Sequence, residues 1–199
     1  MTKSKDPTIG FLELKGAVHG LDALDTVVKA APIEVLRTNI VCPNKFTVLF
    51  GGELAAVSAA LAAARSKVGQ GIYDSCLIGR VHPLLRDGLY GIFPRQKPGT
   101  NGALGILETL TIAAGLCAAD EALKTAEVVL VDLRLGYALG GRTYFLVSGA
   151  ISAVEAAMGA ALQVVIDRGA LGSHSLIPRP SDGLRRMMDF SGGDIGDCT

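Results

Sequence analysis

A single cysteine in a short polar loop is the residue of this sequence most suited to chemistry. Cys42 stands beside Pro43, Asn44 and Lys45, between two apolar runs. Turn formers and a charge indicate an exposed thiol rather than a core residue. A neighbouring cation favours the thiolate, which is the form that binds metals. One thiolate cannot hold an iron–sulfur cluster, whereas three related by a threefold axis would supply three of the usual four cysteine ligands.

The remaining cysteines show no metal-binding pattern. Cys76 lies in an apolar strand and Cys117 at the start of a helix, so we predict that both are structural, and Cys198 lies in a polar tail. No Cys-x-x-Cys pair occurs, so a metal site within one chain is not expected. Nucleophile–base pairs, paired catalytic carboxylates and nucleotide-binding glycine motifs are not found either. We therefore predict that the chain is not an enzyme.

The charge balance of the chain is compatible with assembly, because it leaves little self-repulsion. The 199 residues carry 19 basic and 19 acidic side chains, so the formal net charge is zero. A neutral balance argues against a nucleic-acid partner. Mean hydropathy is +0.40, yet the apolar segment 103–119 contains Glu108 and is shorter than the roughly 20 residues of a membrane span. The apolar segment 150–166 is interrupted by Glu155 and Gln163. We predict a cytoplasmic protein that has no membrane partner, and free thiols rather than disulfides.

The chain is an internal duplication. With a shift of 95 positions, residues 9–13 match residues 104–108, and the same shift pairs Gly20 with Gly115, Asp25 with Asp120 and Lys29 with Lys124. Beyond a longer loop in the second copy, further pairs are Gly52 with Gly149, Val57 with Val154 and Arg80 with Arg179. Because these pairs keep their order along the chain, chance similarity is a poor explanation.

Each copy is predicted to contain strands and helices in the same order. The first has strands at residues 9–14, 33–41 and 46–51, helices at 21–31 and 54–68, and a closing strand and short helix within 75–89. The second has strands at 103–108, 128–135 and 143–147, a helix at 151–167, and the closing elements within 175–188. We predict an α/β sandwich with domains at 8–92 and 103–188, a linker at 93–102, and flexible tails at 1–7 and 189–199.

The repeated segments resemble a known domain. IGFLELKG and LGILETLT, VVKAAPIEVL and ALKTAEVVLV, and SLIPRP are similar to the bacterial microcompartment (BMC) shell domain, which is ferredoxin-like. Two copies in one chain resemble the tandem-domain shell proteins, and the leading strand in each copy implies the unpermuted order. Within that group, VCPNKF and VHPLL are most similar to the iron–sulfur shell protein of propanediol-utilisation compartments.

The resemblance implies a homotrimer that forms a flat pseudohexameric tile of the microcompartment shell. It implies contacts at the tile edge by Lys29, Lys124, Arg80 and Arg179. It places around a central pore the residues Val41, Pro43, Asn44, Lys45, Tyr137, Ala138, Leu139 and Gly140. Three copies of Cys42 would hold one [4Fe-4S] cluster per trimer, for electron transfer across the shell. Implied partners are other shell proteins and an encapsulated redox enzyme.

Two alternatives to the iron–sulfur shell protein remain open. A shell tile with a metal-free pore would pass small polar or anionic metabolites past Asn44 and Lys45. A free α/β regulator that binds a ligand would have no need of matched edge residues, so the pairs Lys29 with Lys124 and Arg80 with Arg179 argue against it.

Overall fold

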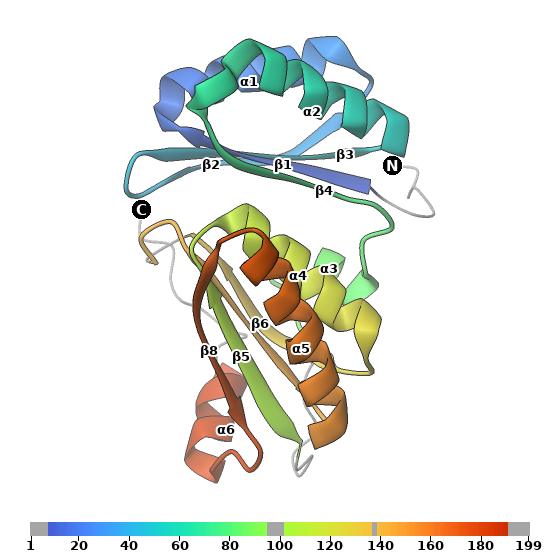
Figure 1. The fold of residues 1–199 in the computed structure, drawn as a ribbon, viewed down its shortest axis with the longest axis vertical. Coiled ribbons are helices and arrows are strands. Elements are labelled where there is room, and N and C mark those ends of the chain that lie inside the picture. The colour runs from blue at the N-terminus through green and yellow to red at the C-terminus, as the bar shows by residue number, and fades with distance from the viewer. Residues whose placement is uncertain (1–7, 95–101, 137–138, 191–199) are drawn as a thin grey trace. The chain divides into compact units, whose positions relative to one another are not determined.

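The computed structural model of the chain describes residues 8–94, 102–136 and 139–190. The first copy of the repeat contains β1 (Thr8–Lys15), α1 (Gly16–Ala30), β2 (Glu34–Val41), β3 (Lys45–Gly52), α2 (Leu54–Val68), a 3-10 turn (Gly69–Gly71), β4 (Ile72–Ile78) and α3 (Pro83–Gly88). The second contains β5 (Ala103–Thr109), α4 (Ile112–Thr125), β6 (Val129–Leu135), β7 (Thr143–Gly149), α5 (Ile151–Asp167), β8 (Leu171–Ile177) and α6 (Asp182–Phe190). Figure 1 shows both sets of elements.

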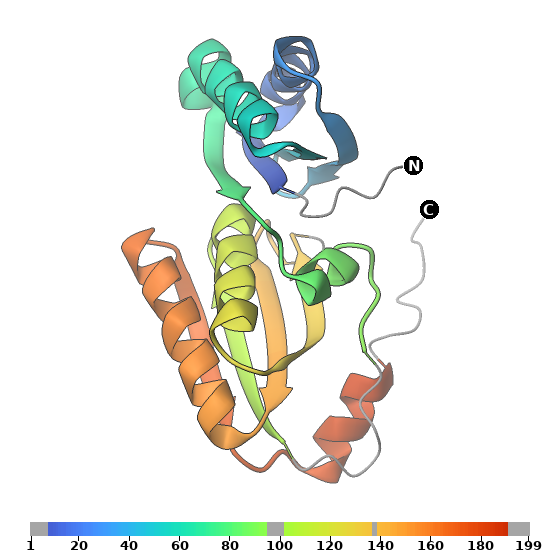
Figure 2. The same cartoon turned by 90° about the vertical axis from the view of Figure 1, so that its right-hand side faces the viewer.

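The two sheets have the same topology. Their strand orders are β2-β3-β1-β4 and β6-β7-β5-β8, with the first strand of each copy paired antiparallel to two neighbours. This is the β-α-β-β-α-β ferredoxin-like arrangement predicted from the sequence, in unpermuted order. Figures 1 and 2 show α1 and α2 side by side on one face of the first sheet.

Small residues bring the helices close to the sheets. Leu12, Leu14 and Phe50 are fully buried beneath α1 and α2, with an exposed fraction of 0% each. In the second copy Met158 and Val154 of α5 lie against Gly105, where an added Cβ would come within 2.7 Å of Met158. At Gly105 the missing side chain therefore allows α5 to pack closely on β5.

Close contacts divide the chain into two compact units. Unit 1 extends to Val81 and takes in Thr111–Cys117 and Leu135–Arg142, whereas unit 2 takes in His82–Leu110, Ala118–Arg134 and the chain from Thr143. Two short segments of the second copy thus belong to the unit of the first, a division that differs from the boundaries at 8–92 and 103–188 that follow the repeat. None of the helices in the described ranges is long and apolar enough to cross a membrane.

The predicted elements are found, with three corrected starts. Helices α2 and α5 have the predicted bounds. Helix α1 begins at Gly16 rather than at Leu21, because the buried residues at its start are the glycines Gly16 and Gly20, which add nothing to the hydrophobic periodicity. Strands β4 and β8 begin at Ile72 and Leu171, ahead of the predicted Ser75 and Ser175, because each pairs along most of the first strand of its copy.

Gly20 allows α1 to lie directly on β3. A Cβ atom at Gly20 would come within 2.2 Å of Phe46 Cγ. We expect Gly20→Ala to lower the free energy of unfolding by about 1–3 kcal/mol, the usual effect of overpacking. Urea unfolding followed by circular dichroism measures this change. Gly159→Ala is the matched control, because this helical glycine is exposed and has nothing within 4 Å of the added Cβ; equal effects of the two substitutions would contradict the packing argument.

Candidate functional site

Cys42 lies in the turn between β2 and β3. Cys42, Pro43 and Asn44 are exposed, the thiol is free, and the preceding Val41 is buried. The Cys42–Pro43 peptide bond is cis, and Asn44 has a φ of 48°. Asparagine and glycine are the residues that adopt this left-handed conformation most readily, so Asn44 suits its place in the turn.

The turn is fastened to the start of α1. The Gly16 N–H donates a hydrogen bond to the Asn44 carbonyl at 2.8 Å. Gly16 has a φ of +79°, and a Cβ atom there would come within 3.1 Å of Asn44 Oδ1. The backbone next to Cys42 is therefore positioned by the junction of β1 and α1.

Lys45 is a buried partner of Glu13, and the expectation of an exposed loop charge was wrong. Only 7% of Lys45 is exposed, and its Nζ donates to Glu13 Oε1 at 2.5 Å and to the Gly141 carbonyl at 3.0 Å. Nζ also lies 4.0 Å from the centre of the Tyr73 ring. Because its charge is paired with Glu13 inside unit 1, the Lys45 side chain does not extend into solvent from the Cys42 turn. Its place at a pore stays a prediction.

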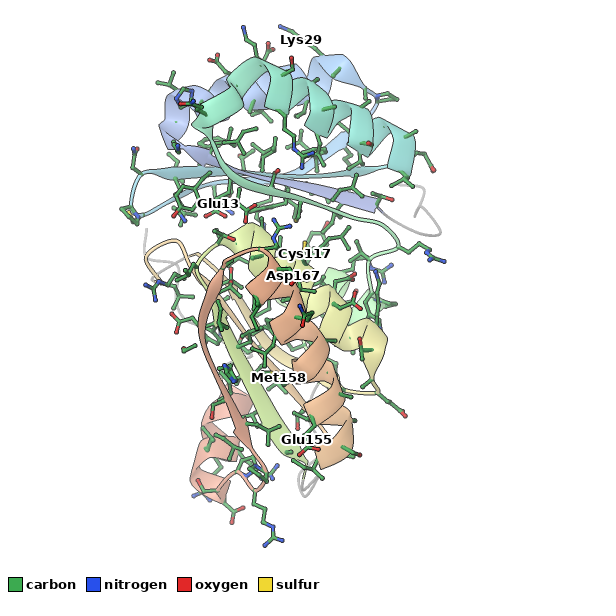
Figure 3. The ribbon with its side chains drawn as sticks, in the orientation of Figure 1. Glu13, Lys29, Cys117, Glu155, Met158 and Asp167 are labelled. Atoms are coloured by element: carbon green, nitrogen blue, oxygen red, sulfur yellow. The ribbon has the colours of Figure 1, made fainter. Side chains whose placement is uncertain are left out.

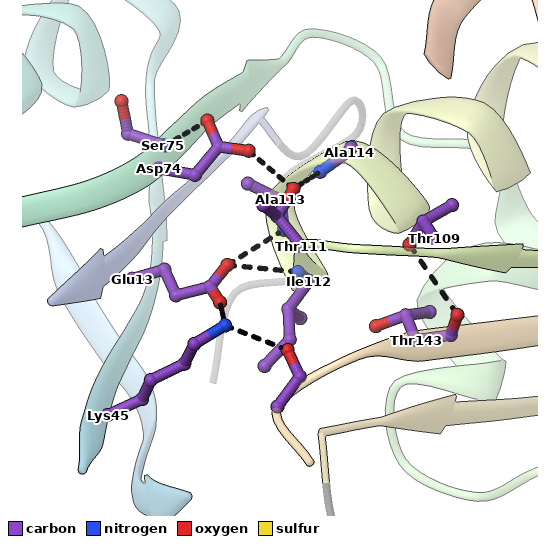
Figure 4. A network of polar contacts seen from close by, with 11 residues as sticks. Glu13, Lys45, Asp74, Ser75, Thr109, Thr111, Ile112, Ala113, Ala114 and Thr143 are labelled. Carbon is purple, nitrogen blue, oxygen red and sulfur yellow. Dashed lines mark hydrogen bonds and ion pairs between the residues drawn. The ribbon is translucent and has the colours of Figure 1, made fainter. Parts of the chain in front are cut away.

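Glu13 joins β1 to the start of α4. Its side chain is fully buried, and its Oε2 accepts hydrogen bonds from the backbone N–H groups of Ile112 at 2.9 Å and Ala113 at 3.5 Å. Figure 4 shows the carboxylate between Lys45 and these N–H groups. Burial raises the pKa of Glu13, and the hydrogen bond and charge of Lys45, followed by the two N–H groups, oppose that rise.

A second polar contact orders the same helix end. Thr111 Oγ1 accepts from the Ala114 N–H at 3.2 Å, which is an N-cap, and its hydroxyl donates to Asp74 Oδ2 at 2.6 Å. Asp74 Oδ1 in turn accepts from the Ser75 N–H at 2.7 Å. The start of α4 therefore carries two acidic groups, one from β1 and one from β4, as the positive end of a helix dipole favours.

The glycine-rich loop between β6 and β7 fits around Lys45 and Val41. Gly136 and Gly141 have φ of 76° and 74°. A Cβ atom at Gly141 would come within 2.9 Å of Lys45 Cδ, and one at Gly136 within 2.8 Å of Val41. Among the predicted pore residues of this loop, Gly140 is exposed and Leu139 partly exposed, whereas Tyr137 and Ala138 lie outside the described residues.

The predicted edge residues occupy equivalent positions in the two copies. Lys29 and Lys124 lie in the last turns of α1 and α4, each paired with the aspartate four residues earlier. Lys29 points outward in Figure 3. Arg80 and Arg179 are exposed after β4 and β8, and Arg80 has a φ of 48°. Their role at a tile edge stays a prediction.

The other thiols are not arranged with Cys42 as metal ligands. Cys76 is buried in β4, as predicted, and Cys117 is partly exposed in α4. Within residues 8–94, 102–136 and 139–190, no three His, Cys, Asp or Glu side chains are grouped so that they could hold a metal ion. Cys198 lies outside these ranges.

Sequence reasoning missed the polar contacts of Glu13, which is buried, and of Asp74 and Thr111, which are partly buried. Two signals were present. Glu13 interrupts an otherwise apolar strand and matches Glu108 in the repeat, and Thr111 precedes an apolar helical run as an N-cap residue does. Neither signal reveals which residues meet, because the contacts join residues distant in sequence: Glu13 and Ile112 are 99 positions apart, and Asp74 and Thr111 are 37 apart.

The fold and repeat define a class of protein. The family described as BMC domain matches residues 8–81 and again residues 103–180. The chain belongs to this family, the shell proteins of bacterial microcompartments, and carries its domain twice. The tandem arrangement predicted from the repeat is confirmed.

Individual relatives agree with this assignment. The chain is 34% identical over 180 residues to the bacterial microcompartment shell protein PduT of Citrobacter freundii, which covers 90% of this chain and 96% of that protein. A crystal structure of a microcompartment protein from Desulfitobacterium hafniense has a TM-score of 0.78, is 33% identical, and covers 91% of this chain and 99% of that one. The carboxysome shell protein CsoS1C of Halothiobacillus neapolitanus is 36% identical over 77 residues, 37% of this chain and 79% of that protein. PduT and CsoS1C are shell proteins, in agreement with the prediction that the chain is not an enzyme.

Removing Lys45 is expected to leave a buried carboxylate without its cation. We expect Lys45→Met to lower the free energy of unfolding by about 3–5 kcal/mol near neutral pH. The double variant Glu13→Gln with Lys45→Met should recover part of this loss, because it removes the uncompensated charge as well. A double variant less stable than Lys45→Met would contradict this account.

The loss in Lys45→Met should also depend on pH. A raised pKa means that folded Glu13 holds its proton at pH values where unfolded Glu13 has lost it, so stability falls as the pH rises above about 4.5. Lys45 opposes the rise of the pKa, so its removal should steepen this fall. Urea unfolding at pH 4.5 and pH 7 measures the slope, and a slope equal to that of the unmodified chain would show that Lys45 does not stabilise the carboxylate.

Proposed function

We propose that three copies of this chain form a pseudohexameric shell tile whose central pore holds a [4Fe-4S] cluster on three Cys42 thiolates. The tile would join other shell proteins at its edges. Its cluster would carry electrons across the shell to an encapsulated redox enzyme. The observation that carries this proposal is the exposed, free thiol of Cys42 in the turn between β2 and β3.

The donor set fits a cluster shared between chains. Cys42 is exposed while Cys76 is buried, so one described thiol per chain stands on the turn, and a ligand set must be completed by symmetry. Thiolates are the usual protein ligands of iron–sulfur clusters. When bound, such a cluster supplies one-electron transfer. The chain's own contribution is to hold Cys42 on a turn whose backbone is fixed by Gly16 and Lys45.

A metal-free pore is the alternative function for the same tile. The exposed residues of the turn are Cys42, Pro43 and Asn44, none of which carries a fixed charge. With Lys45 neutralised by Glu13, such a pore would pass small polar molecules without the preference for anions that a ring of lysines would give.

Iron content distinguishes the two functions. We expect anaerobically purified protein to contain about four irons, with equivalent acid-labile sulfide, per trimer. Cys42→Ser should contain none, because serine does not replace the thiolate ligand. Cys117→Ser is the control and should retain iron. Iron retained in Cys42→Ser would overturn the ligand assignment, and no iron after reconstitution of the unmodified protein would favour the metal-free pore.

The edge assignment has a separate test. We expect Lys29→Ala combined with Lys124→Ala to abolish two-dimensional sheets while trimers persist, because both lysines end equivalent helices at the proposed tile edge. Electron microscopy of concentrated protein, with sedimentation of the same sample, measures both properties. Lys67→Ala, an exposed lysine in the last turn of α2, is the control. Sheets that form equally well without Lys29 and Lys124 would refute their edge role.

A further inference from the structure

Helices α1 and α4 are equivalent in the repeat but differ in exposure. In α1 a row of apolar residues is exposed: Val18 75%, Leu21 59% and Val28 52%. The residues 95 positions later in α4 are buried: Ala113 0%, Leu116 0% and Leu123 4%. The same helix face is therefore exposed in the first copy of the repeat and buried in the second.

The sheet of each copy does not explain this difference. Helix α1 packs on its own sheet through Gly20, Ala23 and Val27, which are buried, and its outer row is still exposed. The outer row of α4 must therefore be covered by other residues. The polar contacts on α4 come from the first copy: Glu13 and Asp74 bind its first turn within unit 1, and the His82 N–H donates to Asp120 at 2.9 Å within unit 2.

The second copy carries equivalents of the groups that bind α4. Glu108 lies 95 positions after Glu13, and the two occupy equivalent places in the repeat: Glu13 pairs with Thr47 of β3, and Glu108 pairs with Tyr144 of β7. The register pairs Leu14 with Phe46 and Thr109 with Thr143, so Arg142, just before β7, corresponds to Lys45. Glu108 is partly exposed, with Ser173 donating to its Oε2 at 3.0 Å, and Arg142 is exposed.

The start of α1 lacks the acidic groups found at the start of α4. No side chain caps it, and its first turn contains no acidic residue. Gly16 stands where α4 has the capping Thr111, and the exposed Ala17 and Val18 stand where Ile112 and Ala113 donate to Glu13. The exposed Lys15 adds a positive charge to this positive helix end.

We propose that copies of this chain join head to tail through the exposed row of α1, with Glu108 of one copy accepting hydrogen bonds from the N–H groups of Ala17 and Val18 of the next. Arg142 pairs with that carboxylate as Lys45 pairs with Glu13. This contact rests on the proposed assembly of several copies, and it would join each chain to the next. A head-to-tail contact of this kind closes into a ring when the rotation permits.

A second pair of groups supports the same contact. His82 and Ser181 are equivalent, and each begins a short helix: His82 Nδ1 accepts from the Leu84 N–H, and Ser181 Oγ accepts from the Leu184 N–H. His82 also donates its backbone N–H to Asp120, whose equivalent in α1 is Asp25 with a side chain 63% exposed. The Ser181 N–H of one copy would donate to Asp25 of the next, which places α6 beside the exposed row of α1.

Sedimentation velocity of the full chain over a range of concentrations tests the contact. We expect Glu108→Gln to raise the dissociation constant between chains by about 10- to 30-fold. The substitution removes the negative charge that the proposed contact places at the positive end of α1 in the next copy. Leu21→Gln should weaken association comparably by removing apolar burial. Thermal unfolding by circular dichroism verifies that each variant is folded.

Two matched controls separate this contact from general surface effects. Glu155→Gln changes an exposed glutamate of α5, and Ile166→Gln changes an apolar residue 55% exposed, close to the 59% of Leu21. Neither control should alter association. If the unmodified chain is a monomer, both this contact and the proposed tile fail. If it is a trimer and Glu108→Gln and Leu21→Gln match their controls, only the contact fails.

Cross-linking gives a readout that does not depend on affinity. A chain carrying Ala17→Cys and Glu108→Cys, treated with a short bis-maleimide reagent, should give covalent trimers on denaturing gels. The chain with Ala17→Cys and Glu155→Cys should give no more cross-linking than the unmodified protein. Equal cross-linking of the two chains would overturn the proposed contact.

Discussion

The buried carboxylate of Glu13 is the interaction on which the rest of the site depends. Removing a carboxylate from water is costly unless cations and hydrogen-bond donors replace the solvent. Here Lys45 and the N–H groups of Ile112 and Ala113 replace it. These donors come from β3 and the start of α4, so one charge orders two elements distant in sequence. Because Lys45 immediately follows the Cys42 turn, the position of the thiol is tied to the same charge.

The turn between β2 and β3 and the loop between β6 and β7 are equivalent in the repeat but differ in composition, because they meet different neighbours. Lys45 donates to the Gly141 carbonyl and lies where a side chain at Gly141 would come within 2.9 Å of it. The second loop therefore needs glycine at this position, both for space and for its φ of 74°. The first loop meets a smaller constraint: Asn44 adopts its left-handed conformation and fastens the turn to Gly16. One loop can carry an exposed thiol, whereas the other is shaped by the lysine beside it.

Sequence reasoning succeeded where the signal was local or repeated. The bounds of α2 and α5 were predicted correctly, the matched copies predicted the same order of elements twice, and the family resemblance implied the ferredoxin-like arrangement. It failed where the deciding contact was distant. Lys45 after two turn formers has the local signature of an exposed charge, and only the fold brings it to Glu13, 32 residues away. The start of α1 was missed for a different reason, since Gly16 and Gly20 are buried without adding to hydrophobic periodicity.

Neutralising Lys45 changes what the Cys42 turn would offer in a pore. Three exposed lysines around an axis would create a positive potential that attracts anions, and the same charges would favour thiolates. With Lys45 bound to the buried Glu13, three copies of the turn around such an axis would offer three thiols and three asparagine amides. A metal-free pore built this way has little electrostatic basis for selecting anions. The one strongly coordinating group left on the turn is the thiol, and its chemistry is better matched to a soft metal than to the passage of charged metabolites.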